Sequence, residues 1–117
     1  MNDPDCLFCK IVAGQIPSTK VLETDRVLAF RDIKPAAPVH VLVIPKDHHA
    51  NVAELVRADA GLAAEVLAAA ADVADAEGVT APGWRLLANS GDDAGQEVHH
   101  VHLHVFGGRP LGPMLSA

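Results

Sequence analysis

The chain has 117 residues, 50% of them hydrophobic, which suffices for one domain with a buried core and leaves no room for a second. Its 15 acidic and 9 basic residues give a net charge of −6, which argues against a surface that binds a long phosphate backbone. With only three phenylalanines and one tryptophan, the stacking platforms of single-strand binders are missing. We therefore expect one domain over residues 1–117 and no nucleic-acid partner, whereas a mononucleotide needs only one apolar slot.

The N-terminus lacks the basic and then apolar run of a secretory signal, and no stretch approaches the length of a membrane span. We therefore expect a cytoplasmic protein with no membrane partner. The two cysteines, Cys6 and Cys9, are spaced as Cys-x-x-Cys. In a reducing compartment this spacing indicates metal ligation or redox chemistry before it indicates a structural disulfide.

Three helices are predicted. Asp3 before Pro4 is typical of an N-cap and a first helical position, which predicts a short helix to about Val12, ending near Gly14. Asn51, with a glutamate three residues later, predicts one short helical turn. The alanine-rich segment 62–77 predicts a long helix that Gly78 terminates, with one apolar face made by Leu62, Val66, Ala69, Ala70 and Val73.

Five apolar or β-branched runs predict strands, over residues 19–23, 26–30, 39–44, 84–88 and 98–106. The first two are separated by Thr24-Asp25, which favours a hairpin. The third is apolar on both sides of the pleat and bounded by prolines, so we expect it at the centre of the sheet. A glycine-rich loop, residues 89–95, separates the last two. This order predicts an α+β domain with an antiparallel sheet of about five strands, one long helix and one or two short helices.

All seven histidines fall in two short windows, as His40, His48 and His49, and as His99, His100, His102 and His104. Alternation along residues 98–106 puts His100, His102 and His104 on one face of the predicted strand. Neighbours in that row lie about 6–7 Å apart, a distance that one phosphate and its oxygens can bridge. We therefore expect the three rings to serve one reacting centre.

Imidazole suits phosphorus chemistry because its pKa of about 6.5 allows one ring to be a free nucleophile while another is a cationic partner for phosphate. The expected mechanism is covalent: one ring nitrogen takes the nucleotidyl group, and water later removes it, without a metal. The attacking ring needs one fixed tautomer, held by a backbone carbonyl or by a second histidine. The alternative interpretation is a surface strip of histidines or a metal site on alternate residues.

The residues around the three histidines resemble a known family. The segment His100-Val-His102-Leu-His104-Val-Phe is similar to the signature of the histidine triad (HIT) family. Residues 6–17, 30–46 and 107–114 also resemble this family, in its purine nucleoside phosphoramidase branch. Together with the triad they span nearly the whole chain. The last of these segments is typical of the bacterial form.

The resemblance implies a HIT-like fold and hydrolysis of purine nucleoside 5′-phosphoramidates, or of aminoacyl adenylates, to the nucleoside monophosphate. It makes His102 the nucleophile and His104 the partner that neutralises phosphate oxygens, with His100 and His40 orienting their neighbours. Asp32 would bind the ribose hydroxyls. The base would lie against Phe8, Ile11, Phe30 and Ile33. The phosphate-side loop would comprise Asn89, the backbone of Gly95, Gln96 and Glu97, and Val98.

This chain departs from the better-known animal relatives at two positions. It has Glu97 where they carry a serine, and His99 where they carry a tyrosine. The serine helps the leaving group, and an ionised carboxylate cannot donate a hydrogen bond. The departure leaves the leaving-group preference and the rate open.

Several of these residues have simpler interpretations. Asp32 serves equally to cap a turn before Pro35. Ile11, Ile33 and Phe30 are ordinary core residues on sequence grounds, and a lone buried His40 is by default a hydrogen-bonded structural histidine. The glycines at 91 and 95 serve a hairpin as readily as a phosphate.

Zinc and self-association are the further expectations. Cys6, Cys9, His48 and His100 would complete a Cys₂His₂ zinc set such as some bacterial relatives bind, while free buried cysteines are the alternative. No cofactor is required for the expected catalysis.

The resemblance also implies a homodimer whose C-terminal segment, residues 109–117, reaches toward the partner's site and tunes substrate choice. The rival functions are dinucleoside polyphosphate hydrolysis, a non-catalytic nucleotide-binding module and a structural zinc protein.

Overall fold

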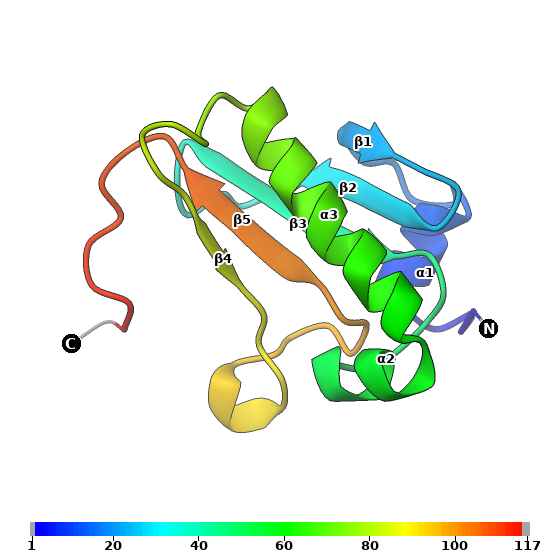
Figure 1. The fold of residues 1–117 in the computed structure, drawn as a ribbon. Helices are drawn as coiled ribbons and strands as arrows, with labels where there is room; N and C mark the ends of the chain where they lie inside the picture. The colour runs from blue at the N-terminus through cyan, green and yellow to red at the C-terminus, as the bar shows by residue number, and fades with distance from the viewer. Residues whose placement is uncertain (1, 116–117) are drawn as a thin grey trace.

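The structure, a computed structural model, describes residues 2–115 and contains a five-stranded antiparallel sheet with helices on both faces (Figure 1). The strands lie in the order β1-β2-β3-β5-β4. Their bounds are Lys20–Glu23 (β1), Val27–Arg31 (β2), Val39–Pro45 (β3), Arg85–Leu87 (β4) and Leu103–Gly107 (β5). The predicted α+β class and five-stranded antiparallel sheet are confirmed.

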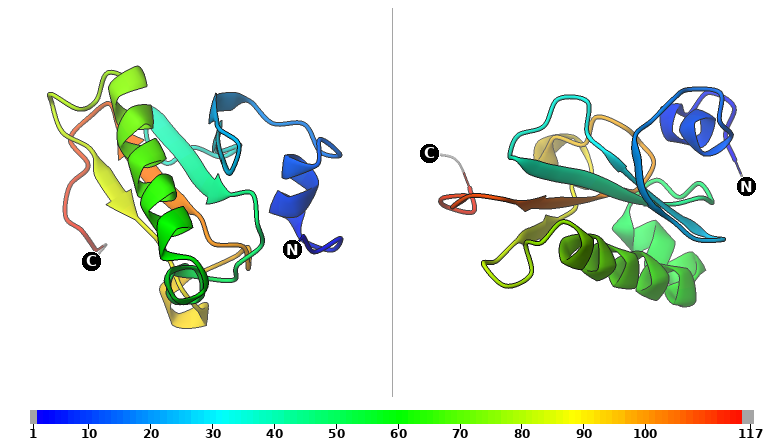
Figure 2. Two further views of the ribbon diagram at one scale, coloured as in Figure 1. Left: turned by 45° about the vertical axis from the view of Figure 1, so that its right-hand side comes forward. Right: turned by 90° about the horizontal axis from the view of Figure 1, so that it is seen from above.

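The central strands bury side chains on both faces, so two separate cores form. One core lies between the sheet and the long helix α3 (Ala60–Ala76), where Val41 and Val43 of β3 meet it. The opposite face packs against α1 (Leu7–Val12), where Leu42 and Ile44 of β3 meet Phe8. Figure 2 shows α3 and α1 on opposite sides of the sheet. β3 is central, as its apolar pattern predicts, and the β1-β2 hairpin forms as expected.

The helix α3 has the predicted apolar face. All five residues expected to be buried are buried, and Gly78 follows the C-cap with a positive φ of 73°. At its start the Leu62 N–H donates to the Asp59 carboxylate at 2.9 Å. The preceding helix α2 (Val52–Ala58) is longer than the single turn predicted, but its N-cap is Asn51, whose side chain accepts the Glu54 N–H.

The start of α1 was predicted wrongly. Its N-cap is Cys6, whose Sγ accepts the Cys9 N–H at 3.4 Å, rather than Asp3. Asp3 instead holds a turn, because its carboxylate accepts the Asp5 N–H at 2.8 Å and its carbonyl accepts the Cys6 N–H. The pair Asp3-Pro4 therefore initiates a turn that sets Cys6 and Cys9 in place. The helix ends at Val12, as expected.

The last strand begins later than predicted. Residues 98–102 are not strand, and β5 begins at Leu103, where it pairs with Val43 of β3. Before that point the chain follows the loop after β3, since the Val101 N–H donates to the His49 carbonyl at 2.7 Å. His100 and His102 thus precede the strand, and only His104 lies within it. The expected row of three histidines on a regular strand is wrong.

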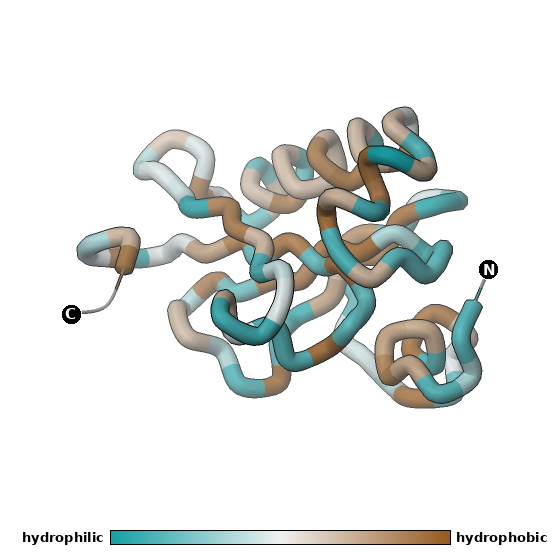
Figure 3. The backbone as a smooth tube through the Cα atoms, turned by 90° about the horizontal axis from the view of Figure 1, so that it is seen from below, coloured by the Kyte–Doolittle hydropathy of each residue, from teal (hydrophilic) through white to brown (hydrophobic). Residues whose placement is uncertain are grey.

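In Figure 3 the hydrophobic, brown segments recur along the strands and helices. No helix in residues 2–115 is both long enough and apolar enough to cross a membrane. After β5 the chain leaves the sheet, and it is held there by the Arg85 guanidinium, which donates to the Gly112 carbonyl at 2.8 Å. The predicted role of residues 109–117 falls partly outside the described residues, at positions 116–117.

Candidate active site

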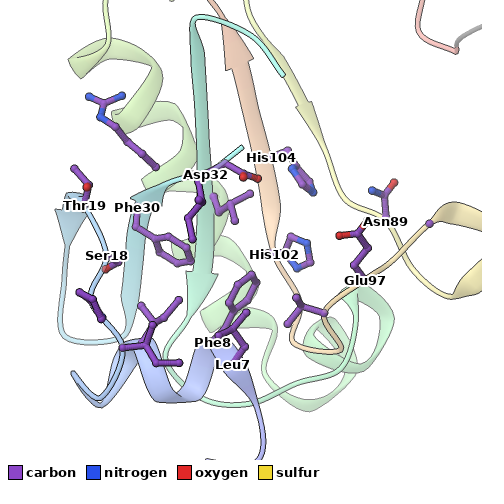
Figure 4. Close-up of a pocket in the computed structure, with 18 residues that line it drawn as sticks. Leu7, Phe8, Ser18, Thr19, Phe30, Asp32, Asn89, Glu97, His102 and His104 are labelled. Carbon is purple, nitrogen blue, oxygen red and sulfur yellow. The ribbon is translucent and has the colours of Figure 1, made fainter. Parts of the chain in front are cut away.

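A pocket of about 730 Å³ lies on the sheet face that carries α1 (Figure 4). One end is apolar and is built by Phe8 and Ile11 of α1 with Phe30 of β2; the Phe8 and Phe30 rings meet edge to face at 5.5 Å. The other end is built by the loop between β4 and β5. Most of the predicted nucleotide-binding residues line the pocket: Phe8, Ile11, Phe30, Asp32, Ile33, Asn89, Gly95, Glu97 and Val98.

His102 lies in the middle of the pocket with a fixed ring. Because a carbonyl only accepts, the 2.8 Å contact from Nδ1 to the His100 carbonyl assigns the proton to Nδ1 and leaves the Nε2 lone pair free. The edge-to-face contact with Phe8 at 5.1 Å restricts the ring further. Burial lowers the pKa of His102, which keeps the ring neutral near pH 7. A neutral imidazole with a free Nε2 is the form that can attack phosphorus.

His104 is oriented through His40. The Ala36 N–H donates to His40 Nδ1 at 3.0 Å, so neutral His40 carries its proton on Nε2. That Nε2–H donates to His104 Nδ1 at 2.9 Å, which places the proton of His104 on its own Nε2. His104 Nε2 is buried and has no hydrogen-bond partner within residues 2–115. An unpaired buried donor beside the free Nε2 of a second imidazole is suited to a phosphate oxygen.

The expectation of a cationic ring in the free site needs correction. Burial, together with the neighbouring His102 and His40 rings, lowers the pKa of His104 to about 4. Burial likewise lowers the pKa of His40, although Asp32 opposes that shift. The free site therefore offers an incoming phosphate a neutral N–H donor rather than a positive charge.

Asp32 combines its two interpretations. Its Oδ1 accepts the Lys34 N–H at 2.8 Å, so it does cap the turn before Pro35. Its Oδ2 lies 3.5 Å from His40 Nε2, and the side chain lines the pocket. One carboxylate oxygen is thus tied to the backbone, while the other lies beside the His40 ring at the pocket.

Gln96, whose backbone the resemblance places at the phosphate, is not among the residues that line the pocket. Its side chain is buried, and its Oε1 accepts the Gly91 N–H at 2.9 Å. Its Nε2 donates to the carbonyls of Ala50 and Val98, at 2.7 and 3.0 Å. Gln96 therefore holds the loop that presents Gly95, Glu97 and Val98 to the pocket. Gly95, at a φ of 82°, adopts a conformation that favours glycine.

His100 turns its ring away from the pocket, so the three rings do not serve one centre. The ring is fully buried, and its Nε2–H donates to the Pro45 carbonyl at 2.8 Å. This fixes an unprotonated Nδ1, which lies 3.4 Å from the sulfur of Cys6 and 3.5 Å from that of Cys9. Burial lowers the pKa of His100 to about 4, so the ring is neutral. The backbone carbonyl of His100, rather than its ring, makes the hydrogen bond to the His102 ring.

The predicted zinc ligands do lie together. Cys6, Cys9, His48 and His100 bring their four ligand atoms within 4.8 Å of one another, and Cys9 Sγ lies 3.4 Å from His48 Nδ1. A tetrahedral zinc ion with ordinary Zn–S and Zn–N bonds would separate a sulfur and a nitrogen by roughly 3.5 Å. The donor set and its spacing therefore fit a structural zinc ion. The Pro45 carbonyl selects the tautomer of His100 that a metal needs.

The HIT domain family model matches residues 13–111. The chain belongs to the HIT family. Its sequence is 42% identical over 112 residues to the purine nucleoside phosphoramidase of Escherichia coli K12, covering 96% of this chain and 94% of that protein. A HIT-like protein of Azospirillum brasilense is 48% identical over 115 residues, covering 97% of this chain and 94% of that protein.

Solved structures agree. A HIT family hydrolase from Clostridium thermocellum superposes with a TM-score of 0.93 at 45% identity, covering 98% of this chain and 100% of that one. A histidine triad protein from Clostridium difficile gives the same TM-score at 41% identity and also covers 98% of this chain and 100% of that one. The protein is thus a hydrolase of the HIT family, and the family, the fold and the enzyme class predicted from the sequence are confirmed.

Several pocket residues of this HIT protein were missed. They come from α1, from the segment before β1 and from the two central strands: Leu7, Ile16, Pro17, Ser18, Thr19, Arg31 and Leu42. Apolar residues at these positions have the pattern of ordinary core, and Ser18 and Thr19 carry no motif. Arg31 is among the lining residues, but its side chain lies on the α3 face of β2 with Val27 and Ala29, and its guanidinium is paired with Glu77 of the cap of α3. No sequence signal joins Arg31 and Glu77.

Proposed function

We propose that this HIT hydrolase cleaves purine nucleoside 5′-phosphoramidates to the nucleoside monophosphate and an amine, with His102 as the nucleophile. One observation carries the proposal: a free His102 Nε2, fixed by the His100 carbonyl, shares the pocket with the unpaired Nε2–H of His104. A nucleophile beside a donor without a partner fits attack at phosphorus and binding of a phosphate oxygen. The Escherichia coli phosphoramidase, at 42% identity, supports the substrate class.

In this proposal the base lies at the apolar end, against Phe8, Ile11 and Phe30. Ile33, whose side chain is 91% exposed, covers the open side of the base. Asp32 accepts hydrogen bonds from the ribose hydroxyls through its pocket-facing oxygen. The phosphate then lies over His102 and His104, at the centre of the pocket.

The reaction has two displacements. His102 Nε2 attacks phosphorus and forms an N–P bond as the P–N bond to the amine breaks, and the departing nitrogen takes a proton from solvent, which the second step returns. Water then attacks phosphorus, the bond to His102 breaks, and the nucleoside monophosphate is released with a neutral ring. Overall, water supplies the hydroxyl on phosphorus and the proton on the amine. Aminoacyl adenylates would react in the same way, with an amino-acid carboxylate as the leaving group.

The pocket disfavours dinucleoside polyphosphates. Among the residues that line the pocket in the described chain, Arg31 is the only lysine or arginine, and Glu77 already holds its guanidinium through two hydrogen bonds. Additional phosphates would lack cationic partners there, whereas a single phosphate needs only the histidines and the loop N–H groups. The lining therefore favours a mononucleotide substrate.

The Cys6, Cys9, His48 and His100 cluster is proposed to hold a structural zinc ion, on the fit of its donor atoms. When bound, the ion would join α1 to the loop after β3 and would supply stability rather than chemistry at phosphorus. Elemental analysis of the purified protein tests this, since about one zinc per chain is expected and none would refute it.

A homodimer is proposed as well. β4 lies at the edge of the sheet and pairs only with β5 among the described strands, and its Leu86 is exposed. On α3, Leu67 is 52% exposed. A second copy would cover both. Light scattering coupled to size exclusion is expected to give twice the mass of the chain, and a monomer at micromolar concentration would refute the proposal.

The function itself is tested with adenosine 5′-phosphoramidate. The wild type should release AMP, and His102→Ala should lose at least about a thousandfold in kcat/KM while still binding AMP. His99→Ala is the matched control, because His99 neighbours the triad in the sequence but is exposed and does not line the pocket. Binding of AMP without turnover by the wild type would instead identify a non-catalytic nucleotide-binding module.

A further inference from the structure

The pocket has a direction, which places the leaving group. The base belongs at the apolar end beside α1 and β2, and the phosphorus lies over His102 and His104. Whatever leaves the phosphorus therefore extends toward the other end, which residues 89–98 build. Figure 4 shows Glu97 and Asn89 at that end, with the Glu97 carboxylate directed toward His102.

Glu97 is the only charged side chain at this end among the described lining residues, since Asp32 lies at the end of β2 and the Arg31 guanidinium is bound to Glu77 on the α3 side of the sheet. It is exposed, and it takes part in none of the ion pairs found in residues 2–115. Its negative charge acts on the His102 ring, because Glu97 is among the groups that raise the pKa of His102 against the larger, lowering effect of burial. The carboxylate therefore acts on the leaving-group end of the site as an unneutralised negative charge.

The loop that carries Glu97 is fixed. Gln96 is tied by three hydrogen bonds to Gly91, Ala50 and Val98, on both sides of Glu97 in the chain. The backbone that carries the Glu97 side chain is thereby held by buried neighbours rather than being a free loop. A charge fixed at the mouth of a pocket discriminates among ligands by their own charge.

We propose that Glu97 selects the leaving group by charge, so that the enzyme prefers phosphoramidates whose amine carries a second, cationic group and discriminates against anionic leaving groups. The proposal rests on the phosphoramidase function proposed above and names its substrate class more closely. An ionised carboxylate cannot donate a hydrogen bond to the departing nitrogen, so charge is the property through which it acts.

The test uses three adenosine 5′-phosphoramidates with the same six-carbon amine. The far end of the amine carries an ammonium group in the first, a methyl group in the second and a carboxylate in the third. The reacting nitrogen is nearly the same in all three, so differences in kcat/KM report the remote charge. In the wild type at low salt we expect kcat/KM to fall about three- to tenfold at each step from cation to neutral to anion. Salt at about 0.5 M should remove most of the difference.

Three variants complete the test. Glu97→Gln should make the three substrates equivalent within about twofold, and Glu97→Lys should invert their order. Glu54→Gln, an exposed change on α2 outside the pocket, should retain the wild-type order. Because the wild-type preference and its salt dependence need no variant, they test the proposal even if a substituted protein folds poorly.

The outcomes separate the two proposals. If the wild type cleaves none of the three substrates, the phosphoramidase function fails. If it cleaves all three at equal rates, or if the preference persists in Glu97→Gln, the function stands and the role of Glu97 is refuted.

Discussion

Gln96 provides a test of how the active-site loop is built. Its amide uses one acceptor and two donors, joining the Gly91 N–H to the carbonyls of Ala50 and Val98 at 2.7 to 3.0 Å. Three separate pieces of backbone thus meet on one buried side chain. Substitution should disturb both the stability of the domain and the position of the loop beside His102.

Gln96→Ala removes all three hydrogen bonds, each with a net value of about 0.5–1.5 kcal/mol. Because the loop lies near the surface, water can replace part of the loss, so we expect the free energy of unfolding to fall by about 2–3 kcal/mol. Urea denaturation followed by circular dichroism measures this. In the same protein kcat/KM for adenosine 5′-phosphoramidate should fall by about ten- to a hundredfold.

Gln96→Glu is the sharper variant because it has nearly the same shape. Its carboxylate can still accept from Gly91, but it turns an oxygen toward the carbonyls of Ala50 and Val98, where the amide had donated. At pH 7 this near-isosteric variant should be less stable than Gln96→Ala, since repulsion and burial of a charge add to the lost bonds. A Gln96→Glu protein as stable as the wild type would refute the assigned network.

Three further predictions concern pH, metal and ribose. The pKa of His104 is about 4 in the folded protein and about 6.5 when unfolded, so the unfolded state binds the proton first as the pH falls. The free energy of unfolding should therefore fall between pH 6.5 and 4, by about 3 kcal/mol for this group. Urea denaturation over this pH range measures the fall, and a His104→Gln variant with the same pH slope as the wild type would contradict it. Cys9→Ser should lower both the bound zinc and the melting temperature, whereas a change at the exposed His99 should alter neither; a metal content equal to that of the wild type would rule out the assigned ligand set. Asp32→Asn should lower kcat/KM about tenfold for a ribonucleoside phosphoramidate but little for the 2′,3′-dideoxy analogue, and equal losses on both would remove Asp32 from the ribose site.

The sequence predicts the regular parts of this fold well because local patterns determine them. The apolar face of α3 follows from helical spacing, and Gly78 ends the helix by adopting a φ that other residues rarely take. The segment 39–44 is apolar on both faces because the β3 it forms has a core on each side. In each case the local residue pattern shows which faces are buried, even where the elements that cover them are distant in the sequence.

The errors arise where distant segments decide the structure. Alternation alone extends the last strand back to residue 98, but the carbonyl of His49 takes the Val101 N–H and ends the sheet pairing there. In this non-strand segment the ring of His100 lies against Cys6 and Cys9, which no periodicity of the sequence indicates. The resemblance predicts Gln96 in the phosphate-side loop, but nothing in the sequence shows that its side chain binds the carbonyl of Ala50, which lies on a different segment.

The candidate site divides in the same way. The triad and the Cys-x-x-Cys pair are visible as motifs, and the resemblance adds Asp32 and the phosphate-side loop. The tautomer relay from Ala36 through His40 to His104 requires coordinates, because it depends on which nitrogen faces which neighbour. Neutral rings in the free site are likewise a consequence of burial, which the sequence does not contain.

The central claim is that His102 becomes covalently attached to the nucleotide. Rapid mixing of the enzyme with adenosine 5′-phosphoramidate, alkaline quenching within milliseconds and mass spectrometry of the peptides measures this directly, because a phosphorus–nitrogen bond to histidine survives base better than acid. We predict a transient peptide heavier by one adenylyl group, with the modification on His102 and none on His104 or His99. An adduct on another residue, or rapid turnover during which no adduct is ever seen, would contradict the account.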